Sequence, residues 1–208
     1  MTSTKKFIGE GFDRIDGLLK VTGAARYSTD YPVKDLVHGV LLKSEIASGK
    51  LVDIDTTAAE KSPGVLAVIT HKNCPKLNER GGVRGGAMLQ NPNIDHHGQT
   101  IGVVVAETFE QARAAANLVK VSYEKAEAKT DFEKYAANPI PSRNQGSADA
   151  VRGDVNAAIA SADFKIEAVY ETPIEHHQPM EPHATIAVWE GEKLTLYNPS
   201  QIVNGAQS

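Results

Sequence analysis

The fold of this chain is decided by Ile101-Gly102-Val103-Val104-Val105-Ala106, a run that leads through Thr108 into an alanine-rich segment. A continuous apolar run of β-branched residues is typical of a strand that is buried on both faces. Thr108 is suited to cap the first turn of a helix. Apolar side chains then recur at helical spacing, at Phe109, Ala112, Ala116 and Val119. Residues 119–123 resume as a strand, so the sequence predicts strand, helix and strand in succession.

Shorter patterns on both sides of this unit predict further strands and helices. Apolar and polar residues alternate in several segments, which is the period of a half-buried strand. The predicted strands cover residues 25–31, 37–44, 51–55, 65–70, 164–172, 185–189 and 193–197. Helices are predicted at residues 56–60, 131–137 and 153–162, and Glu60 would complete a capping box in the first if Thr57 is the cap. Residues 71–98 are expected to form a long exposed loop.

Charge and cysteine content exclude several classes of protein. The 208 residues carry 22 basic and 26 acidic side chains, a net charge of −4, whereas a nucleic-acid-binding protein would show a basic face. The single cysteine, Cys74, allows no internal disulfide and cannot by itself hold an iron–sulfur cluster. No apolar run reaches the roughly 18 residues of a membrane helix, and the first residues lack the apolar core of a secretory signal. We therefore expect a cytoplasmic protein; a periplasmic location would require a partner subunit that carries the export signal.

The densest group of ionisable side chains lies in Glu175-His176-His177-Gln178-Pro179-Met180-Glu181-Pro182-His183. If this segment is extended, His177, Glu181 and His183 project from one face. Two imidazoles and a carboxylate can ligate a divalent metal such as zinc. However, Pro179 and Pro182 interrupt regular strand pairing, and histidines also occur as packed residues with satisfied nitrogens. A metal site at these three residues is therefore an alternative, and the prediction is that the chain has no dedicated metal ligands.

Several short motifs together resemble one family. They follow one another along nearly the whole chain: Arg14-Ile15-Asp16-Gly17, Lys20-Val21-Thr22-Gly23-Ala24-Ala25-Arg26-Tyr27-Ser28-Thr29-Asp30, Pro63-Gly64-Val65, Gly98-Gln99-Thr100-Ile101-Gly102-Val103-Val104-Val105-Ala106-Glu107-Thr108, Val121-Ser122-Tyr123-Glu124, His177-Gln178-Pro179-Met180-Glu181-Pro182-His183 and Pro199-Ser200-Gln201. In this order they are similar to the N-terminal part of the molybdenum-binding (large) subunit of the xanthine dehydrogenase and aldehyde oxidase family.

The resemblance implies an α+β fold in four parts. Residues 1–17 would form an N-terminal arm, and residues 18–128 would form the a/b hammerhead domain of the family. A connecting segment, residues 129–152, would lead into residues 153–208, the incomplete beginning of the molybdopterin-binding domain. The chain is therefore expected to be the front of a longer subunit.

The resemblance also implies a chemistry. Members of the family hydroxylate aldehydes or N-heterocycles with oxygen from water at a molybdenum–pterin cofactor, and electrons leave through an iron–sulfur subunit and an FAD subunit. The catalytic glutamate and most pterin contacts lie further along the family's sequence. We therefore expect this chain alone to be inactive and to bind no cofactor, with the remainder of the molybdenum subunit as its first partner. The alternatives are a non-catalytic binding or assembly module of the same ancestry and a small metal-binding protein.

Two residues carry over as cofactor-binding candidates, and none as a catalytic residue. Glu175 stands where well-known members have a glutamine near the molybdenum ligands, so that this contact differs in the present chain. A carboxylate there resembles the branch of bacterial periplasmic aldehyde oxidases. Gln201 matches a recurrent glutamine of the family, and the resemblance implies that it is either structural or adjacent to the cofactor in a complete subunit.

Overall fold

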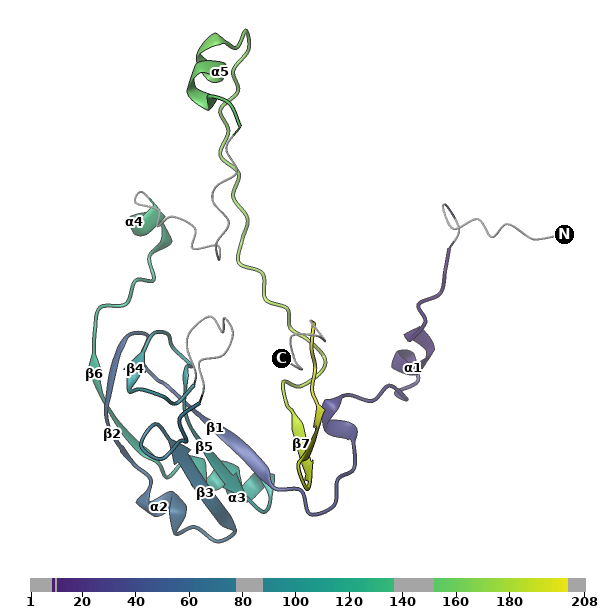
Figure 1. Cartoon of the computed structure of the whole chain (residues 1–208), viewed down its shortest axis with the longest axis vertical. Helices are drawn as coiled ribbons and strands as arrows, with labels where there is room; N and C mark the ends of the chain where they lie inside the picture. Colours follow the sequence, from purple (N-terminus) through teal and green to yellow (C-terminus); the bar gives the residue numbers. More distant parts are fainter. Residues whose placement is uncertain (1–8, 10, 78–87, 137–151, 202–208) are drawn as a thin grey trace, which may run out of the picture. The chain divides into compact units, whose positions relative to one another are not determined.

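The computed structural model describes residues 9, 11–77, 88–136 and 152–201. The chain forms two compact units. The first unit comprises residues 1–34 and 164–208, and the second unit comprises residues 35–163. In Figure 1 the strands β1 to β6 belong to the second unit, and the hairpin that contains β7 belongs to the first. Within the described residues, no helix has both the length and the apolar character to cross a membrane.

The second unit is built on two small antiparallel sheets. The first has the strand order β1-β5-β3, formed by His38–Lys43, Thr100–Ala106 and Val65–Thr70. The second has the order β4-β2-β6, formed by Asn93–Ile94, Gly49–Asp55 and Lys120–Lys125. Its helices are α2 (Thr57–Glu60), α3 (Phe109–Ala116), α4 (Phe132–Ala136) and α5 (Val155–Ser161). The predicted strand, helix and strand are therefore present, but β5 and β6 belong to different sheets.

The strand β5 lies in the centre of the first sheet, as its β-branched run predicted. Val104 is fully buried and stands in register with Val40 of β1 and Val68 of β3. Helix α3 packs over β1 and β5. The opposite face of the same sheet carries Val103 and Val105, which are only half-buried among the described residues. The prediction of burial on both faces is therefore met on the helix side alone.

The apolar core of the second unit joins the two sheets to helices α2 and α3. Burial of this apolar surface is the main term that stabilises the unit. The buried members of the cluster are Leu42, Ile46, Leu51, Ile54, Ala59, Val68, Ile94, Ile101, Val104 and Ala115.

Helix α3 begins as the sequence predicted. Thr108 Oγ1 accepts a hydrogen bond from the N–H of Gln111 (3.2 Å), and Gln111 Oε1 accepts one from the N–H of Thr108 (3.0 Å). This reciprocal pair satisfies two backbone donors that would otherwise lack partners at the helix start. Ala112 and Ala115 are buried, whereas Phe109 is exposed. The predicted apolar stripe was therefore wrong at its first member, because the helix turns its small side chains toward the sheet.

Helix α2 is present but is capped differently from the prediction. Its N-cap residue is Thr56, and the side chain of Asp55 accepts a hydrogen bond from the N–H of Thr57 (3.0 Å). Hydrogen bonding by Thr57 holds the pKa of the Asp55 carboxyl below its usual value. Thr56 Oγ1 donates to Glu60 Oε1 (2.6 Å). The capping box with Thr57 as its cap was therefore wrong, because the aspartate that ends β2 supplies the acceptor.

The described part of the first unit holds short elements without a large core. Helix α1 (Gly17–Val21) has no buried residue, and a 3-10 turn, Ser28–Asp30, follows it. Strands β7 (Ile186–Glu190) and β8 (Lys193–Tyr197) pair as an antiparallel hairpin, as predicted. Two predicted strands are absent. Residues 25–31 contain the 3-10 turn instead, and residues 164–172 are not part of a strand in the structure.

Candidate functional site

The histidine-rich segment, residues 175–183, contains neither helix nor strand. Most of its side chains are exposed, and only Glu181 is half-buried. The backbone of Gln178 has a φ of 43°, in the left-handed region that non-glycine residues rarely adopt. Within residues 9–77, 88–136 and 152–201, no three histidine, cysteine or acidic side chains are grouped closely enough to hold a metal ion. His177, Glu181 and His183 are thus not brought together as ligands.

Glu181 instead anchors the segment to the 3-10 turn. Its Oε1 accepts a hydrogen bond from the backbone N–H of Ser28 (3.0 Å), and Ser28 Oγ donates to the carbonyl of Ala184 (2.8 Å). Ser28 is buried, with 7% of its surface exposed. The Asp30 side chain accepts a hydrogen bond from the N–H of Tyr27 (2.8 Å), which fixes the turn. Two segments more than 150 residues apart are therefore held together by a serine and a carboxylate.

The hairpin continues this anchored region. Tyr31 stacks on Tyr197 of β8, with ring centroids 4.3 Å apart, a close approach for an offset aromatic pair. Thr185 Oγ1 donates to Asn198 Oδ1 at the open end of the hairpin (2.5 Å). Ile186, at the start of β7, is buried. These contacts fix the chain on both sides of Ala184, directly after the histidine-rich segment.

The two cofactor-binding candidates occupy exposed positions in the first unit. Glu175 lies at the start of the histidine-rich segment, and Gln201 lies beyond the end of β8. Both side chains are exposed and are therefore open to a group supplied from outside the described residues. Their roles remain predictions.

Sequence reasoning missed the contact between Glu181 and Ser28. The only signal available was the presence of both residues in motifs shared with the family, and neither motif indicates its partner. A hydrogen bond between residues this far apart depends on the folded path of the chain. Local periodicity carries no information about it.

We predict that Ser28→Ala will loosen this region without unfolding the second unit. The variant loses one hydrogen bond to the Ala184 carbonyl, which is worth about 1 kcal/mol. Amide hydrogen exchange of residues 184–190 should therefore become about fivefold faster. The control is Ser48→Ala, because Ser48 lies in the second unit, directly before β2. Unchanged exchange in Ser28→Ala would contradict the anchoring role.

A titratable group with a shifted pKa lies at the end of β3. His71 is half-buried beside Leu51 and Gln99, and this burial, with a smaller contribution from the neighbouring Lys72, lowers its pKa. Lys72 Nζ is itself held by Asp53 Oδ1 at 2.8 Å. The folded state therefore favours the neutral imidazole.

We predict that this histidine makes the second unit less stable in mild acid. Because its folded-state pKa lies below the unfolded value of about 6.5, the unfolded chain binds the proton more readily between the two values. The unfolding free energy should fall as the pH decreases below about 6.5, with a slope of at most about 1.4 kcal/mol per pH unit for one proton. Urea unfolding at several pH values should show that the unfolding free energy of His71→Asn falls less steeply with decreasing pH than that of the parent. Identical profiles for the variant and the parent would contradict the assignment.

Sequence comparison identifies the family. A sequence profile of the aldehyde oxidase and xanthine dehydrogenase a/b hammerhead domain matches residues 22–127. The chain belongs to this family. A profile of the molybdopterin cofactor-binding domain matches residues 138–208. These matches confirm the predicted α+β fold of a molybdenum-binding large subunit. They place a hammerhead domain first and the start of the cofactor-binding domain after it. The family uses a molybdopterin cofactor, and part of the domain that binds it is present here.

Curated relatives extend the match across nearly the whole chain. The aldehyde oxidoreductase molybdenum-binding subunit PaoC of Escherichia coli strain K12 is 44% identical over 203 residues, which cover 96% of this chain and 27% of the relative. The xanthine dehydrogenase molybdenum-binding subunit of Escherichia coli O157:H7 is 30% identical over 206 residues, with coverage of 91% and 27%. The chain thus spans about a quarter of the length of these relatives.

Solved structures of the family share the fold. Quinoline 2-oxidoreductase from Pseudomonas putida 86 aligns with a TM-score of 0.70 and 26% identity, over 92% of this chain and 27% of that chain. The aldehyde oxidoreductase from Desulfovibrio gigas aligns with a TM-score of 0.63 and 26% identity, over 88% and 22% of the two chains. The similarity therefore includes both the hammerhead domain and the start of the cofactor-binding domain.

Proposed function

We propose that this chain forms the N-terminal part of a molybdenum hydroxylase subunit that oxidises aldehydes with oxygen from water. The observation that carries the proposal is its 44% identity to a subunit named for aldehyde oxidation. A relative named for xanthine dehydrogenase is 30% identical over a similar length. We also propose that residues 1–17 form the arm, 18–128 the hammerhead domain, 129–152 the connection and 153–208 the start of the cofactor-binding domain.

The residues present fit the molybdenum–pterin cofactor only as part of a larger site. When bound, this cofactor supplies the redox centre for hydroxylation. The exposed amide of Gln201 can donate hydrogen bonds to an anionic group, and the exposed carboxylate of Glu175 can accept them from a protonated one. Two such side chains cannot enclose a cofactor of this size. We propose that both approach it in the complete subunit, where other residues supply the remaining contacts.

An exposed apolar segment in the first unit supports a role for the remainder of the subunit. Residues 164–174 form no strand in the structure, yet apolar and charged side chains largely alternate over residues 164–171, as in a half-buried strand. Such a surface is costly to leave in water. The exposed apolar members are Phe164, Ile166, Val169, Tyr170 and Ile174. We propose that the rest of the cofactor-binding domain pairs with this segment and covers it.

Electron transfer would require partners. A chain with one cysteine cannot hold the thiolate-ligated cluster that accepts electrons in this kind of enzyme. We therefore propose an iron–sulfur subunit and an FAD subunit as partners, in the cytoplasm or, if a partner carries an export signal, in the periplasm.

The proposal is tested on the complete gene product, purified with its co-expressed partner subunits. We expect stoichiometric molybdenum and turnover of aromatic or aliphatic aldehydes to carboxylates that contain ¹⁸O when the reaction is run in labelled water. The value of kcat/KM for aldehydes should exceed that for hypoxanthine by at least about tenfold, since discrimination of this size needs only about 1.4 kcal/mol. A product of only 208 residues in the source cells, without molybdenum, would instead support the non-catalytic binding or assembly module.

The candidate residues are tested in the same complex. Gln201→Ala should reduce molybdenum content or the rate of aldehyde oxidation by about tenfold if the amide contacts the cofactor. Glu175→Gln should change the rate, whereas Glu171→Gln, at an exposed position four residues earlier, serves as the control. The 208-residue chain on its own should contain no stoichiometric molybdenum and should not turn over an aldehyde. Molybdenum and activity in that chain would overturn the expectation.

A second candidate activity is the hydroxylation of an N-heterocycle. Its specific support is the alignment with quinoline 2-oxidoreductase, at a TM-score of 0.70 over 92% of this chain. The same assay distinguishes the two, because faster turnover of quinoline or hypoxanthine than of any aldehyde would favour this candidate.

A further inference from the structure

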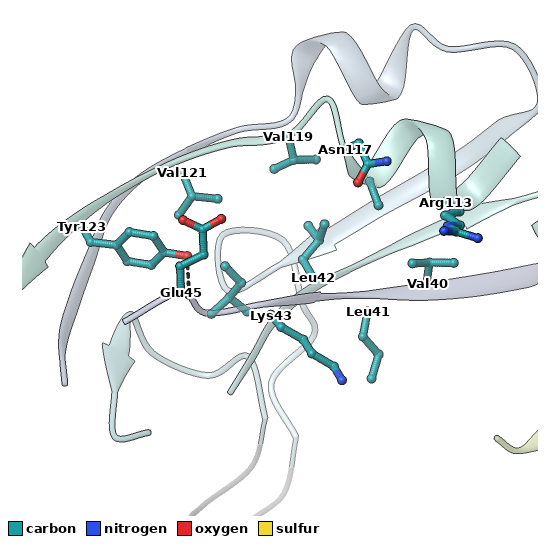
Figure 2. A pocket seen from close by; sticks show the side chains of 12 residues that line it. Val40, Leu41, Leu42, Lys43, Glu45, Arg113, Asn117, Val119, Val121 and Tyr123 are labelled. Carbon is teal, nitrogen blue, oxygen red and sulfur yellow. Dashed lines mark hydrogen bonds between the residues drawn. The ribbon is translucent and has the colours of Figure 1, made fainter. Parts of the chain in front are cut away.

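A groove lies between the two sheets of the second unit. Figure 2 shows it between strand β1, the last turn of α3 and the strand β6. Its volume is about 240 Å³, enough for two or three side chains of moderate size. Its wall combines apolar side chains with polar and charged groups. The residues with apolar side chains in its wall are Val40, Leu42, Ile101, Ala116, Val119 and Val121.

The main-chain edge of β1 forms one side of this groove. Four consecutive residues, 40 to 43, line it. Side chains of consecutive strand residues point to opposite faces, as Figure 2 shows for Leu42 and Leu41. A run of consecutive lining residues therefore means that the backbone of the strand borders the space. Among the described strands, β1 pairs only with β5, and β6 pairs only with β2, so that both strands facing the groove have a free edge.

The two ends of the groove carry opposite charges. Arg113, in the last turn of α3, lies at one end. Glu45 and Tyr123 lie at the other, where the N–H of Glu45 donates to the Tyr123 hydroxyl (3.4 Å). In the described part of the chain, Arg113 forms no ion pair. Lys43 also borders the groove, but its side chain points to the other face of the sheet.

We propose that this groove binds an extended segment of a partner protein, which pairs as an antiparallel strand with the free edge of β1. A free edge offers unpaired backbone donors and acceptors, and strand addition is a recurrent mode of peptide recognition. All described strand pairs of this chain are antiparallel. In this direction the N-terminal end of the partner segment lies beside Glu45 and its C-terminal end lies beside Arg113.

The wall of the groove specifies the side chains of that segment. Side chains on one face of a strand repeat about every 6.8 Å, so that two apolar residues at positions i and i+2 can enter beside Val40 and Leu42. A basic residue toward the N-terminal end complements Glu45, and an acidic residue toward the C-terminal end complements Arg113. Charge complementarity of this kind fixes the register and direction of an added strand.

The first test uses the 208-residue chain and the synthetic peptide acetyl-Lys-Thr-Val-Thr-Val-Thr-Glu-amide. We expect saturable shifts of backbone NMR signals at residues 38–45 and 119–123, with slower amide exchange along β1. The control peptide, acetyl-Lys-Pro-Val-Pro-Val-Pro-Glu-amide, keeps the charges and valines but lacks alternate N–H donors. Equal binding of the two peptides, or no binding of the first, would overturn the proposal.

The second test reverses the charge at one end. Arg113→Glu should weaken binding of the first peptide by about fivefold, which is the scale of an exposed ion pair. The same variant should bind acetyl-Lys-Thr-Val-Thr-Val-Thr-Lys-amide more tightly than the parent does, a gain that simple destabilisation cannot produce. Lys61→Glu, at an exposed position on α2's C-terminal side, is the matched control. Light scattering measures whether the parent chain is a dimer and whether Arg113→Glu dissociates it. Such a dimer would overturn the proposal, because a second copy of this chain would then occupy the groove.

Discussion

Gly49→Ala should be the most damaging single-methyl substitution that we predict, costing the second unit about 3 kcal/mol of unfolding free energy. Gly49 begins β2 with a φ of 142°, which side-chain-bearing residues rarely adopt. A Cβ atom there would lie 2.1 Å from the carbonyl oxygen of Glu124 and 3.1 Å from the nitrogen of Ala126. Both neighbours are backbone atoms, so that relief requires β2 and β6 to separate where they pair. Urea unfolding, monitored by circular dichroism, measures the loss.

The matched control is Gly98→Ala. Gly98 also has a positive φ, 77°, but no atom lies within 4 Å of an added Cβ. The unfolding free energy of this variant should therefore fall only by the cost of placing alanine in the left-handed conformation, about 1 kcal/mol. If the two alanine variants unfold at the same urea concentration, the close approach of the Glu124 carbonyl is not what constrains Gly49.

Ile54→Ala is expected to cost about 3 kcal/mol through a cavity in the core. Ile54 lies on β2, is 4% exposed and belongs to the cluster between the sheets. It stands in register with Val121 of β6. Truncation removes apolar contacts on the side where the two sheets meet, and the closely packed surroundings can close the space only in part. The measurement is again the unfolding free energy in urea.

Val52→Ala on the same strand serves as the control for Ile54→Ala. Val52 is 64% exposed and lies at the irregularity in the pairing of β2 with β6. Its truncation should change the unfolding free energy by less than about 0.5 kcal/mol. Similar losses in both variants would mean that Ile54 is not part of a packed core.

The elements of the second unit were largely predictable because their signals are local. A β-branched run and a hydroxyl before an alanine-rich segment each depend only on neighbouring residues. The elements that accordingly lie close to their predicted positions are β1, β2, β3, β5, α3 and β6. Pairing was not predictable, because it joins segments far apart in the chain. Nothing in the sequence of β6 shows that it leaves the sheet of β5 and pairs with β2.

In the first unit, local patterns predicted less. Residues 164–172 have the alternation of a strand, but a strand forms only when a second strand pairs with its backbone, and in the structure these residues form no strand. Residues 25–31 form a turn because Asp30 and Glu181 accept backbone N–H groups that a strand would have paired elsewhere. For the candidate site, the sequence indicated Glu175 and Gln201 only through resemblance.

The strand pairing has a consequence for how the protein is made. Residues 49–55 pair with residues 120–125, and residues 38–43 pair with residues 100–106. During synthesis, neither sheet can be completed until a long stretch of chain has left the ribosome, so that the early strands must wait with their apolar residues in water. Such non-local topology favours slow folding, on the scale of milliseconds to seconds, and exposes the nascent chain to aggregation. We therefore expect the yield of correctly folded protein to depend on chaperones and on the rate of translation across residues 56–119.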